Sequence, residues 1–204
     1  MKLYGCKGCG SAAVEVILQL ARVKYEFVDA IQWQPFQRHI ELEALNPLGQ
    51  VPVLVLDDGT VMTESTAILL YFSELMPGMI PDEDTPRALF YRWMLFVASN
   101  LYAVFQFRDF PERWVDGTDA QRAFREKTDA RLQACWRILE VELRPAPYVI
   151  GAEMTTLDVV LAMCSRWGPG RAWITEQCPR LTAAIHLTEQ HPVVNAVWEN
   201  NFAS

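Results

Sequence analysis

The sequence predicts an α/β domain followed by an all-α helical domain. The first 76 residues alternate short apolar runs with helical patterns. Two of those runs flank Asp-Asp-Gly, which is a strong hairpin signal. From Pro86 onward the periodicity is helical, with proline, glycine or short polar turns between the segments. We therefore expect domains at residues 1–76 and 86–204, joined by a linker at residues 77–85.

The first domain is expected to follow the order β-α-β-α-β-β-α. A helix that is apolar on most faces is a buried one, and strict alternation indicates a half-buried strand. These rules predict strands at residues 2–4 and 25–29 and helices at residues 11–23, 32–44 and 64–75. The remaining two strands lie in VPVLVLDDGTVMT, on either side of the turn.

The second domain is expected to be helical throughout. Helical periodicity covers residues 87–107, 120–143, 155–167 and 172–188. Before it, PGMIPDEDTP holds three prolines and three acids, which is typical of an ordered linker. We find no strand signal in this half of the chain.

Composition narrows the functional classes. The 204 residues carry a formal net charge of −7, so the chain has no basic footprint for nucleic acid or for an anionic membrane surface. Neither a signal peptide nor a membrane-spanning apolar run is expected. The five cysteines are an odd number and are expected to be reduced, which favours a cytoplasmic protein.

The first candidate site is CKGC, which holds Cys6 and Cys9 just after the first strand. A cysteine where a strand turns into a helix lies beside the unpaired N–H groups and the positive dipole end of that helix. Both favour the thiolate form. Gly8 and Gly10 leave the sulfur of Cys9 accessible, and Ser11 is placed to cap the helix or to donate to a thiolate.

Several interpretations of CKGC remain open at this point. Cys9 is a reactive thiol, and Cys6 is either a structural neighbour or a resolving partner. Alternatively, both cysteines pack in the turn. A zinc site is not expected, because no second Cys or Cys/His pair lies at ligand spacing.

The second candidate stretch is NPLGQVPVL, residues 46–54. The bond between Val51 and Pro52 is either an ordinary trans strand start or a cis bond. A cis bond would turn the backbone of Val51 outward, where its N–H and C=O could pair with a peptide-like ligand.

The third candidate stretch is TESTAI, residues 63–68. Glu64 and Ser65 offer a carboxylate, a hydroxyl and helix N-terminal N–H groups at one point. Such a set suits the charged ends of an amino acid, with Glu64 on the ammonium and Ser65 on the carboxylate. The alternative is a simple helix start with an acid near the dipole.

Together these stretches resemble the glutathione S-transferase superfamily. The resemblance rests on MKLYG, CKGCGS, NPLGQVPVLVLDDG, TESTAILLYF and GAEMTTLD, which occur in the family's order over nearly the whole chain. It implies a thioredoxin-like amino-terminal domain, glutathione as co-substrate and a homodimer. It also implies no metal, and a buried capping box at Thr155 and Asp158.

The resemblance assigns roles to residues of the first domain. Val51 resembles the backbone partner of the glutathione cysteine, beside a cis Pro52. Glu64 and Ser65 resemble the pair that binds the γ-glutamyl end. The glutathione-binding set implied in this way is Gly10, Gln50, Val51, Pro52, Glu64 and Ser65.

The turn is most similar to the bacterial beta class, which typically reads Gly-Ala-Cys-Ser. Here the residues are Gly8-Cys9-Gly10-Ser11, so the sulfur lies one residue earlier. Either Cys9 supplies a slightly displaced thiolate, or Ser11 steadies the glutathione thiolate. We expect Cys9 to be the catalytic residue and Ser11 to be its rival.

The expected function is glutathione transfer to small electrophiles, a detoxification chemistry, with thiol–disulfide exchange through Cys9. One alternative is a disulfide or dehydroascorbate reductase of glutaredoxin-like chemistry. Another is a glutathione-dependent isomerase or lyase. A third is a non-catalytic glutathione-binding or protein-interaction module, because fold alone does not settle function.

Candidates for the electrophile pocket come from the aromatic stretch at residues 100–114. They are Tyr102, Phe105 and Gln106, with core packing as the alternative. Trp167 is either another wall of the pocket or a core residue. Arg108 is expected either to attract an anionic substrate or to pair with Asp109 or Glu112.

Overall fold

The computed structural model describes residues 1–30, 40–168 and 170–202. The chain divides into two compact units. The first comprises Met1–Ile80 and Glu189–Ser204, and the second comprises Pro81–Thr188. A small mixed sheet with helices is followed by helices, so the expected fold class is confirmed.

The first unit is built on a four-stranded sheet in the order β2-β1-β3-β4. Its strands are β1 (Lys2–Gly5), β2 (Glu26–Asp29), β3 (Val53–Val55) and β4 (Val61–Met62). β1 pairs parallel with β2 and antiparallel with β3, and β3 pairs antiparallel with β4. A parallel pair needs a crossover connection, and α1 (Ser11–Leu20) supplies it. The expected strands and hairpin are therefore confirmed.

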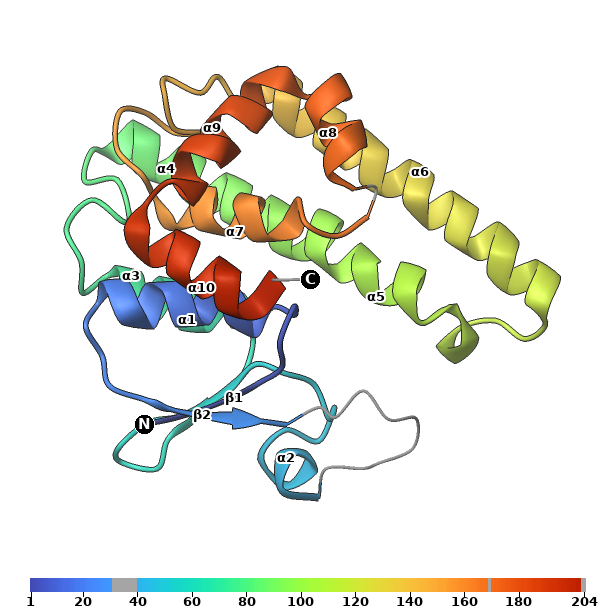
Figure 1. Cartoon of the computed structure of the whole chain (residues 1–204), viewed down its shortest axis with the longest axis horizontal. Helices are drawn as coiled ribbons and strands as arrows, with labels where there is room; N and C mark the ends of the chain where they lie inside the picture. The colour runs from blue at the N-terminus through green and yellow to red at the C-terminus, as the bar shows by residue number, and fades with distance from the viewer. Residues whose placement is uncertain (31–39, 169, 203–204) are drawn as a thin grey trace. The chain divides into compact units, whose positions relative to one another are not determined.

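Alternation along β1 gives the sheet two apolar faces. Tyr4 lies opposite Val53 in the register and packs in one core cluster with Leu42 of α2 (Ile40–Leu45). Leu3, opposite Leu54, projects to the other face. That face is covered by α1 and α3 (Ser65–Ser73), which pack together, while α2 lies on the opposite side of the sheet (Figure 1).

The helix expected at residues 32–44 can be compared only in part. It is observed from Ile40 to Leu45, and residues 31–39 lie outside the described residues.

The other regular elements of the described residues are helices. They are α4 (Asp84–Phe96), the π-helix η1 (Val97–Tyr102), α5 (Ala103–Asp109), the 3-10 turn η2 (Pro111–Arg113), α6 (Thr118–Glu142), α7 (Thr156–Cys164), α8 (Arg171–Gln177), α9 (Pro179–Glu189) and α10 (Pro192–Phe202). Within the described ranges no strand follows β4, as expected.

The prediction of a single helix at residues 172–188 is wrong. The segment forms two helices, α8 and α9, separated at Cys178. Pro179 explains the break, because a proline inside a helix removes a backbone donor and clashes with the preceding turn. At the start of α9 the same proline is well placed.

The final helix, α10, is absent from the sequence expectations. Pro192 begins it, and its buried side recurs at helical spacing through Val194, Val197, Trp198 and Asn201. It packs on α1, and Asn201 Nδ2 donates to Glu15 Oε1 at 3.0 Å. Packing thus groups α10 with the first unit, whereas the expected division at residues 1–76, 77–85 and 86–204 follows the chain. The division into domains at residues 1–76 and 86–204 therefore stays a prediction.

The capping box expected at α7 is confirmed. Asp158 is buried and accepts from the Thr155 N–H at 2.9 Å and from the Thr155 hydroxyl at 2.8 Å. It also accepts from the Val149 N–H at 2.9 Å, which ties the preceding loop to the helix start. Burial nevertheless raises the pKa of Asp158 to about 6, against the opposing effect of these hydrogen bonds.

The helical run Asp84–Asp109 is long and apolar enough to cross a membrane, by length and composition alone. Core helices of folded domains pass the same test. Here Phe90, Trp93, Met94 and Leu101 are buried within the second unit, which fits a core helix.

Candidate active site

The CKGC segment forms a tight turn between β1 and α1. The Cys9 N–H donates to the Cys6 carbonyl oxygen at 3.4 Å, which closes the turn. Gly8, at the third position, has φ +74°, the left-handed value that a type II turn requires there. Gly10 is the N-cap of α1 and Ser11 is the first helical residue. The chain therefore places Cys9 just before the amino end of a helix.

The Cys9 sulfur is partly buried and lies among polar groups of its own turn. Cys9 Sγ is 2.9 Å from the Cys6 carbonyl oxygen and 3.3 Å from Ser11 Oγ. The Ser11 hydroxyl donates to the Cys6 carbonyl oxygen at 3.1 Å and accepts from the Cys6 N–H at 3.3 Å. Ser11 is 0% exposed, whereas Cys9 is half-buried. Of these two groups, the one that can meet a ligand is the Cys9 sulfur.

The two cysteines of the turn differ in acidity. A hydrogen bond from Cys6 lowers the pKa of Cys9 to about 6, and bonds from Ser11 act in the same direction while burial opposes them. The hydrogen bond to Cys9, burial and the nearby negative charge raise the pKa of the Cys6 thiol. The two shifts act in opposite directions, so Cys9 is the more acidic thiol of the turn.

Strand pairing brings the three candidate stretches to one end of the sheet. The β1–β3 register runs from Lys2↔Val55 to Tyr4↔Val53, and continuing it by two pairs places Val51 opposite Cys6. β4 runs antiparallel to β3, so its carboxyl end, which leads to Glu64, lies at the same end. The turn, the Val51 backbone and the start of α3 are thus neighbours at one end of the sheet.

The Val51–Pro52 bond is cis, which confirms the second interpretation of this stretch. Val51 is half-buried and Pro52 is buried. The preceding loop is organised by Asn46, whose side-chain amide donates to the Gln50 carbonyl oxygen at 2.9 Å. The position of Gln50 beside the site is therefore fixed by the loop itself.

Glu64 has an unusual backbone conformation at the start of α3. Its φ is 59°, a value that non-glycine residues rarely adopt. Its carboxylate is exposed, and the first helical turn leaves the N–H groups that follow without intrahelical acceptors. Ser65, the first helical residue, is half-buried. Strained backbone of this kind is concentrated at ligand-binding sites.

The three candidate pocket residues lie on the second unit. Tyr102 and Phe105 both meet the ring of Trp167 edge-on, with centroid distances of 5.6 and 5.0 Å. Phe105 is buried, whereas Tyr102, Gln106 and Trp167 are partly exposed. Phe105 thus acts largely as core, and the other three retain accessible surface.

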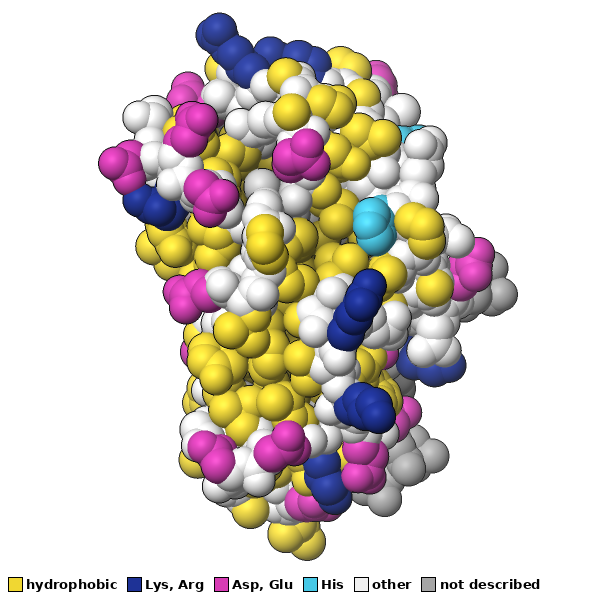
Figure 2. All heavy atoms as spheres, turned by 90° about the vertical axis from the view of Figure 1, so that its left-hand side faces the viewer, with side chains coloured by type: hydrophobic (Ala, Val, Ile, Leu, Met, Phe, Trp, Pro, Cys, Tyr) yellow, Lys and Arg dark blue, Asp and Glu magenta, His cyan; other side chains and the backbone are white. Residues whose placement is uncertain are grey.

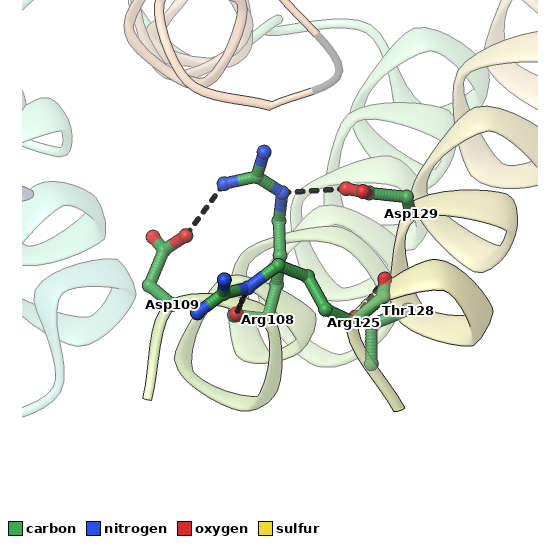
Figure 3. Close-up of polar contacts among 5 residues, drawn as sticks. All are labelled: Arg108, Asp109, Arg125, Thr128 and Asp129. Atoms are coloured by element: carbon green, nitrogen blue, oxygen red, sulfur yellow. Dashed lines mark hydrogen bonds and ion pairs between the residues drawn. The ribbon is translucent and has the colours of Figure 1, made fainter. Parts of the chain in front are cut away.

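Arg108 is paired within the second unit. Its Nε donates to Asp129 Oδ1 at 2.5 Å and its Nη1 to Asp109 Oδ1 at 2.7 Å, while Arg125 Nε donates to the Arg108 carbonyl oxygen at 3.0 Å (Figure 3). The expected pairing with Asp109 is confirmed. Two carboxylates already neutralise the guanidinium, so the structure gives no support to the anionic-substrate interpretation.

Sequence analysis missed one buried polar contact near the turn. Glu15, on α1, is 5% exposed and receives hydrogen bonds from Asn201 and, at 3.4 Å, from the Tyr25 hydroxyl. Burial raises its pKa, and those bonds oppose the change. The signal was present as a single acid in an otherwise apolar helix, but its distant partner Asn201 could not be read from periodicity.

The described residues contain no group of three or more His, Cys, Asp and Glu side chains placed to hold a metal ion. All five cysteines are free thiols.

Comparison with known proteins identifies the family. Residues 3–79 match the family model described as the glutathione S-transferase amino-terminal domain. The GST-like protein YncG of Escherichia coli K12 is 32% identical over 203 residues, covering 98% of each chain. The chain belongs to the glutathione S-transferase family. GstA of Escherichia coli O157:H7 is 27% identical and covers 95% of each chain.

Solved structures agree with this assignment. A glutathione transferase homologue from Sulfitobacter, with bound glutathione, is 26% identical and superposes with a TM-score of 0.85, covering 98% of this chain and 97% of that one. A beta-class transferase of Sphingomonas chungbukensis, 23% identical, shares the fold with a TM-score of 0.80 over the whole of both chains. The family, fold class and enzyme class expected from the sequence are thereby confirmed.

The acidity of Cys9 in this transferase can be measured by alkylation. The thiolate is the reactive form, so the rate of alkylation should rise with pH through a midpoint near 6 and level off above it, instead of near the free-thiol value of about 8.5. Ser11→Ala should raise the midpoint, because it removes a hydrogen bond that favours the thiolate. Mass spectrometry of the Cys9 peptide reads the modification.

Two controls accompany this measurement. Ser99→Ala removes an exposed serine hydroxyl from η1 and should leave the midpoint unchanged. Cys164, which is fully buried, should stay unmodified at every pH. A Cys9 midpoint at the ordinary thiol value would contradict the assignment of a stabilised thiolate.

Proposed function

We propose that this chain conjugates glutathione to small electrophiles at a site formed by the Cys9 turn, Val51 and the start of α3. The observation that carries the proposal is the accessible Cys9 sulfur at the amino end of α1, whose hydrogen bonds favour the thiolate. Family membership and the structure of the Sulfitobacter homologue with bound glutathione support the choice of co-substrate. We propose a cytoplasmic location, supported by five free thiols.

Glutathione is proposed to lie across the end of the sheet where the three stretches meet. Its sulfur faces Cys9 and Gly10, and its cysteinyl backbone pairs with Val51, between Gln50 and Pro52. Its γ-glutamyl ammonium lies on the Glu64 carboxylate. Ser65 and the N–H groups of α3 take the γ-glutamyl carboxylate, because a helix amino terminus favours an anion.

Thiol–disulfide exchange is a second candidate function, and the acidity of Cys9 favours it. Two thiolates side by side repel, so a Cys9 thiolate accepts glutathione more readily as a mixed disulfide than as a neighbouring anion. Ser11 has a supporting role here, since its buried hydroxyl contacts Cys9 instead of solvent. The partly exposed Tyr102 and Gln106, with the mostly buried Phe105, are proposed to contact the electrophile.

Two assays on one variant separate the candidate functions. Cys9→Ser should lower glutathione-dependent reduction of a small disulfide by at least about a hundredfold, because an alcohol cannot form a mixed disulfide. Conjugation to a nitro-substituted aryl chloride should change by less than about tenfold, since the serine hydroxyl can donate a hydrogen bond to the glutathione sulfur. Cys135→Ser, which changes a cysteine of the second unit, should affect neither rate.

The same assays test the alternatives. Glutathione binding without turnover in either assay would contradict the transferase proposal and favour a non-catalytic binding module. Turnover of one metabolite only, with poor activity on the aryl chloride, would instead favour an isomerase or a lyase.

Glu64 is the sharpest test of the glutathione pose. Glu64→Gln keeps the shape of the side chain but removes its charge, so calorimetric glutathione affinity should fall about tenfold or more. Glu74→Gln, at the other end of α3, is the matched control and should bind normally. Equal glutathione affinity in the two variants would show that the γ-glutamyl ammonium does not bind Glu64.

We also propose that the chain forms a homodimer. Apolar side chains gather on the face shown in Figure 2, among acidic and basic ones. Exposed apolar residues include Tyr71 and Leu75 at the end of α3 in the first unit and Leu89 and Leu95 on α4 in the second. Apolar surface of this kind indicates an interaction site when it is contiguous.

The homodimer is tested by sedimentation. The chain should sediment at twice its monomer mass, and Leu89→Glu should shift it to the monomer, because a buried unpaired charge opposes association. Ile138→Glu, at another exposed apolar position, should leave the mass unchanged. A wild-type monomer at micromolar concentration would overturn this proposal.

A further inference from the structure

Cys6 has no role in the function proposed above, yet the turn holds its backbone against Cys9. The hydrogen bond from the Cys9 N–H to the Cys6 carbonyl oxygen closes a four-residue turn with a left-handed Gly8. Such turns keep the first and fourth Cα atoms within about 7 Å. Disulfides span Cα distances of about 4.4–6.8 Å, so the backbone already suits a Cys6–Cys9 bond.

The side chains agree with the backbone. Cys9 Sγ lies 2.9 Å from the Cys6 carbonyl oxygen, so the sulfur is folded back over Cys6 instead of extending away from it. Cys6 is 1% exposed, which bars an external thiol or disulfide from reaching it directly. Cys135, Cys164 and Cys178 are themselves buried in the second unit. Within the described part of the chain, Cys9 is therefore the cysteine placed to form a disulfide with Cys6.

The protonation of the pair changes when Cys9 reacts. In the resting turn, the hydrogen bond to Cys9, burial and the Cys9 negative charge raise the pKa of Cys6, so Cys6 is an inert thiol. Once Cys9 is joined to glutathione through a disulfide, its charge is gone. The first and third causes then disappear, and Cys6 becomes easier to ionise next to a disulfide sulfur that it can attack.

We propose that Cys6 resolves the mixed disulfide between Cys9 and glutathione, closing a Cys6–Cys9 disulfide in the CKGC turn and releasing glutathione. This inference rests on the proposed function, because it requires glutathione at Cys9. It makes the site a dithiol that can be oxidised by glutathione disulfide and held inactive until it is reduced.

The chemistry balances in two exchanges. The Cys9 thiolate attacks glutathione disulfide, forming the Cys9–glutathione bond and releasing one glutathione thiolate. The Cys6 sulfur then attacks Cys9 Sγ, the bond to glutathione breaks, and the second glutathione leaves with the electron pair. The Cys6 proton passes to that thiolate through solvent. The two cysteines are oxidised, and one glutathione disulfide is reduced to two glutathione molecules.

The sequence provides a direct readout of the proposed bond. Lys7 lies between the two cysteines, so trypsin separates Cys6 in residues 3–7 from Cys9 in residues 8–22. The reduced full-length protein is incubated with glutathione disulfide, quenched with acid and digested. Wild type should yield these two peptides linked to each other. Cys6→Ser should yield peptide 8–22 carrying glutathione, and Cys135→Ser should behave as wild type.

The amount of adduct provides the quantitative test. The Cys9–glutathione adduct should be at least about tenfold less abundant in wild type than in Cys6→Ser, because an intramolecular thiol acts at high effective concentration. The linked peptide from wild type supports the inference without reference to any variant, so a poorly folded Cys6→Ser protein does not leave the question open.

Two other outcomes overturn the inference and are distinguishable from each other. A wild-type adduct on Cys9 as abundant as in Cys6→Ser would show that Cys6 does not resolve it, while leaving the proposed function intact. If neither protein yields a Cys9–glutathione adduct and wild type yields no linked peptide, both this inference and the role of Cys9 in the proposed function are overturned.

Discussion

The close packing of Ser11 against Gly5 is the contact on which the amino-terminal site depends. A methyl group at residue 5 would lie 2.5 Å from Ser11 Oγ, so glycine is needed for the helix start to approach the end of β1. That approach lets the Ser11 hydroxyl bond both the N–H and the carbonyl oxygen of Cys6. These contacts fix the end of β1, the turn and the start of α1 relative to one another. Cys9 lies between them, so they also fix its orientation.

The opposite acidities of the two thiols in the turn connect the proposed chemistries. Burial of Cys6 favours its neutral form, and the thiol that it keeps then stabilises the Cys9 thiolate. A stabilised thiolate at a helix start is suited to exchange with a disulfide, whereas conjugation needs only a donor facing the glutathione sulfur. We therefore expect the acidity of the pair, more than the fold, to decide between the two proposed activities.

Buried polar groups fix the helices around this site and elsewhere. Glu15 and Asn201 are 186 positions apart in sequence but share a hydrogen bond that joins α10 to α1. In the second unit, the partly exposed ion pair of Arg108 and Asp129 joins α5 to α6. The Glu15–Asn201 bond compensates part of the cost of burying two polar side chains, and each pair specifies one packing arrangement of its helices.

The sequence by itself determined the strands, the hairpin and the position of Cys9 after β1, because these features depend on local periodicity and turn chemistry. The capping box at Asp158 was implied by the resemblance to the family. Periodicity failed at the helix over residues 172–188, where Pro179 overrides the apolar pattern, and at α10. The tertiary structure alone decided the partners of Glu15 and Arg108, the grouping of α10 with the first unit and the direction of the Cys9 sulfur. These depend on contacts between segments far apart in the chain, or on one side-chain torsion, and neither leaves a periodic signal in the sequence.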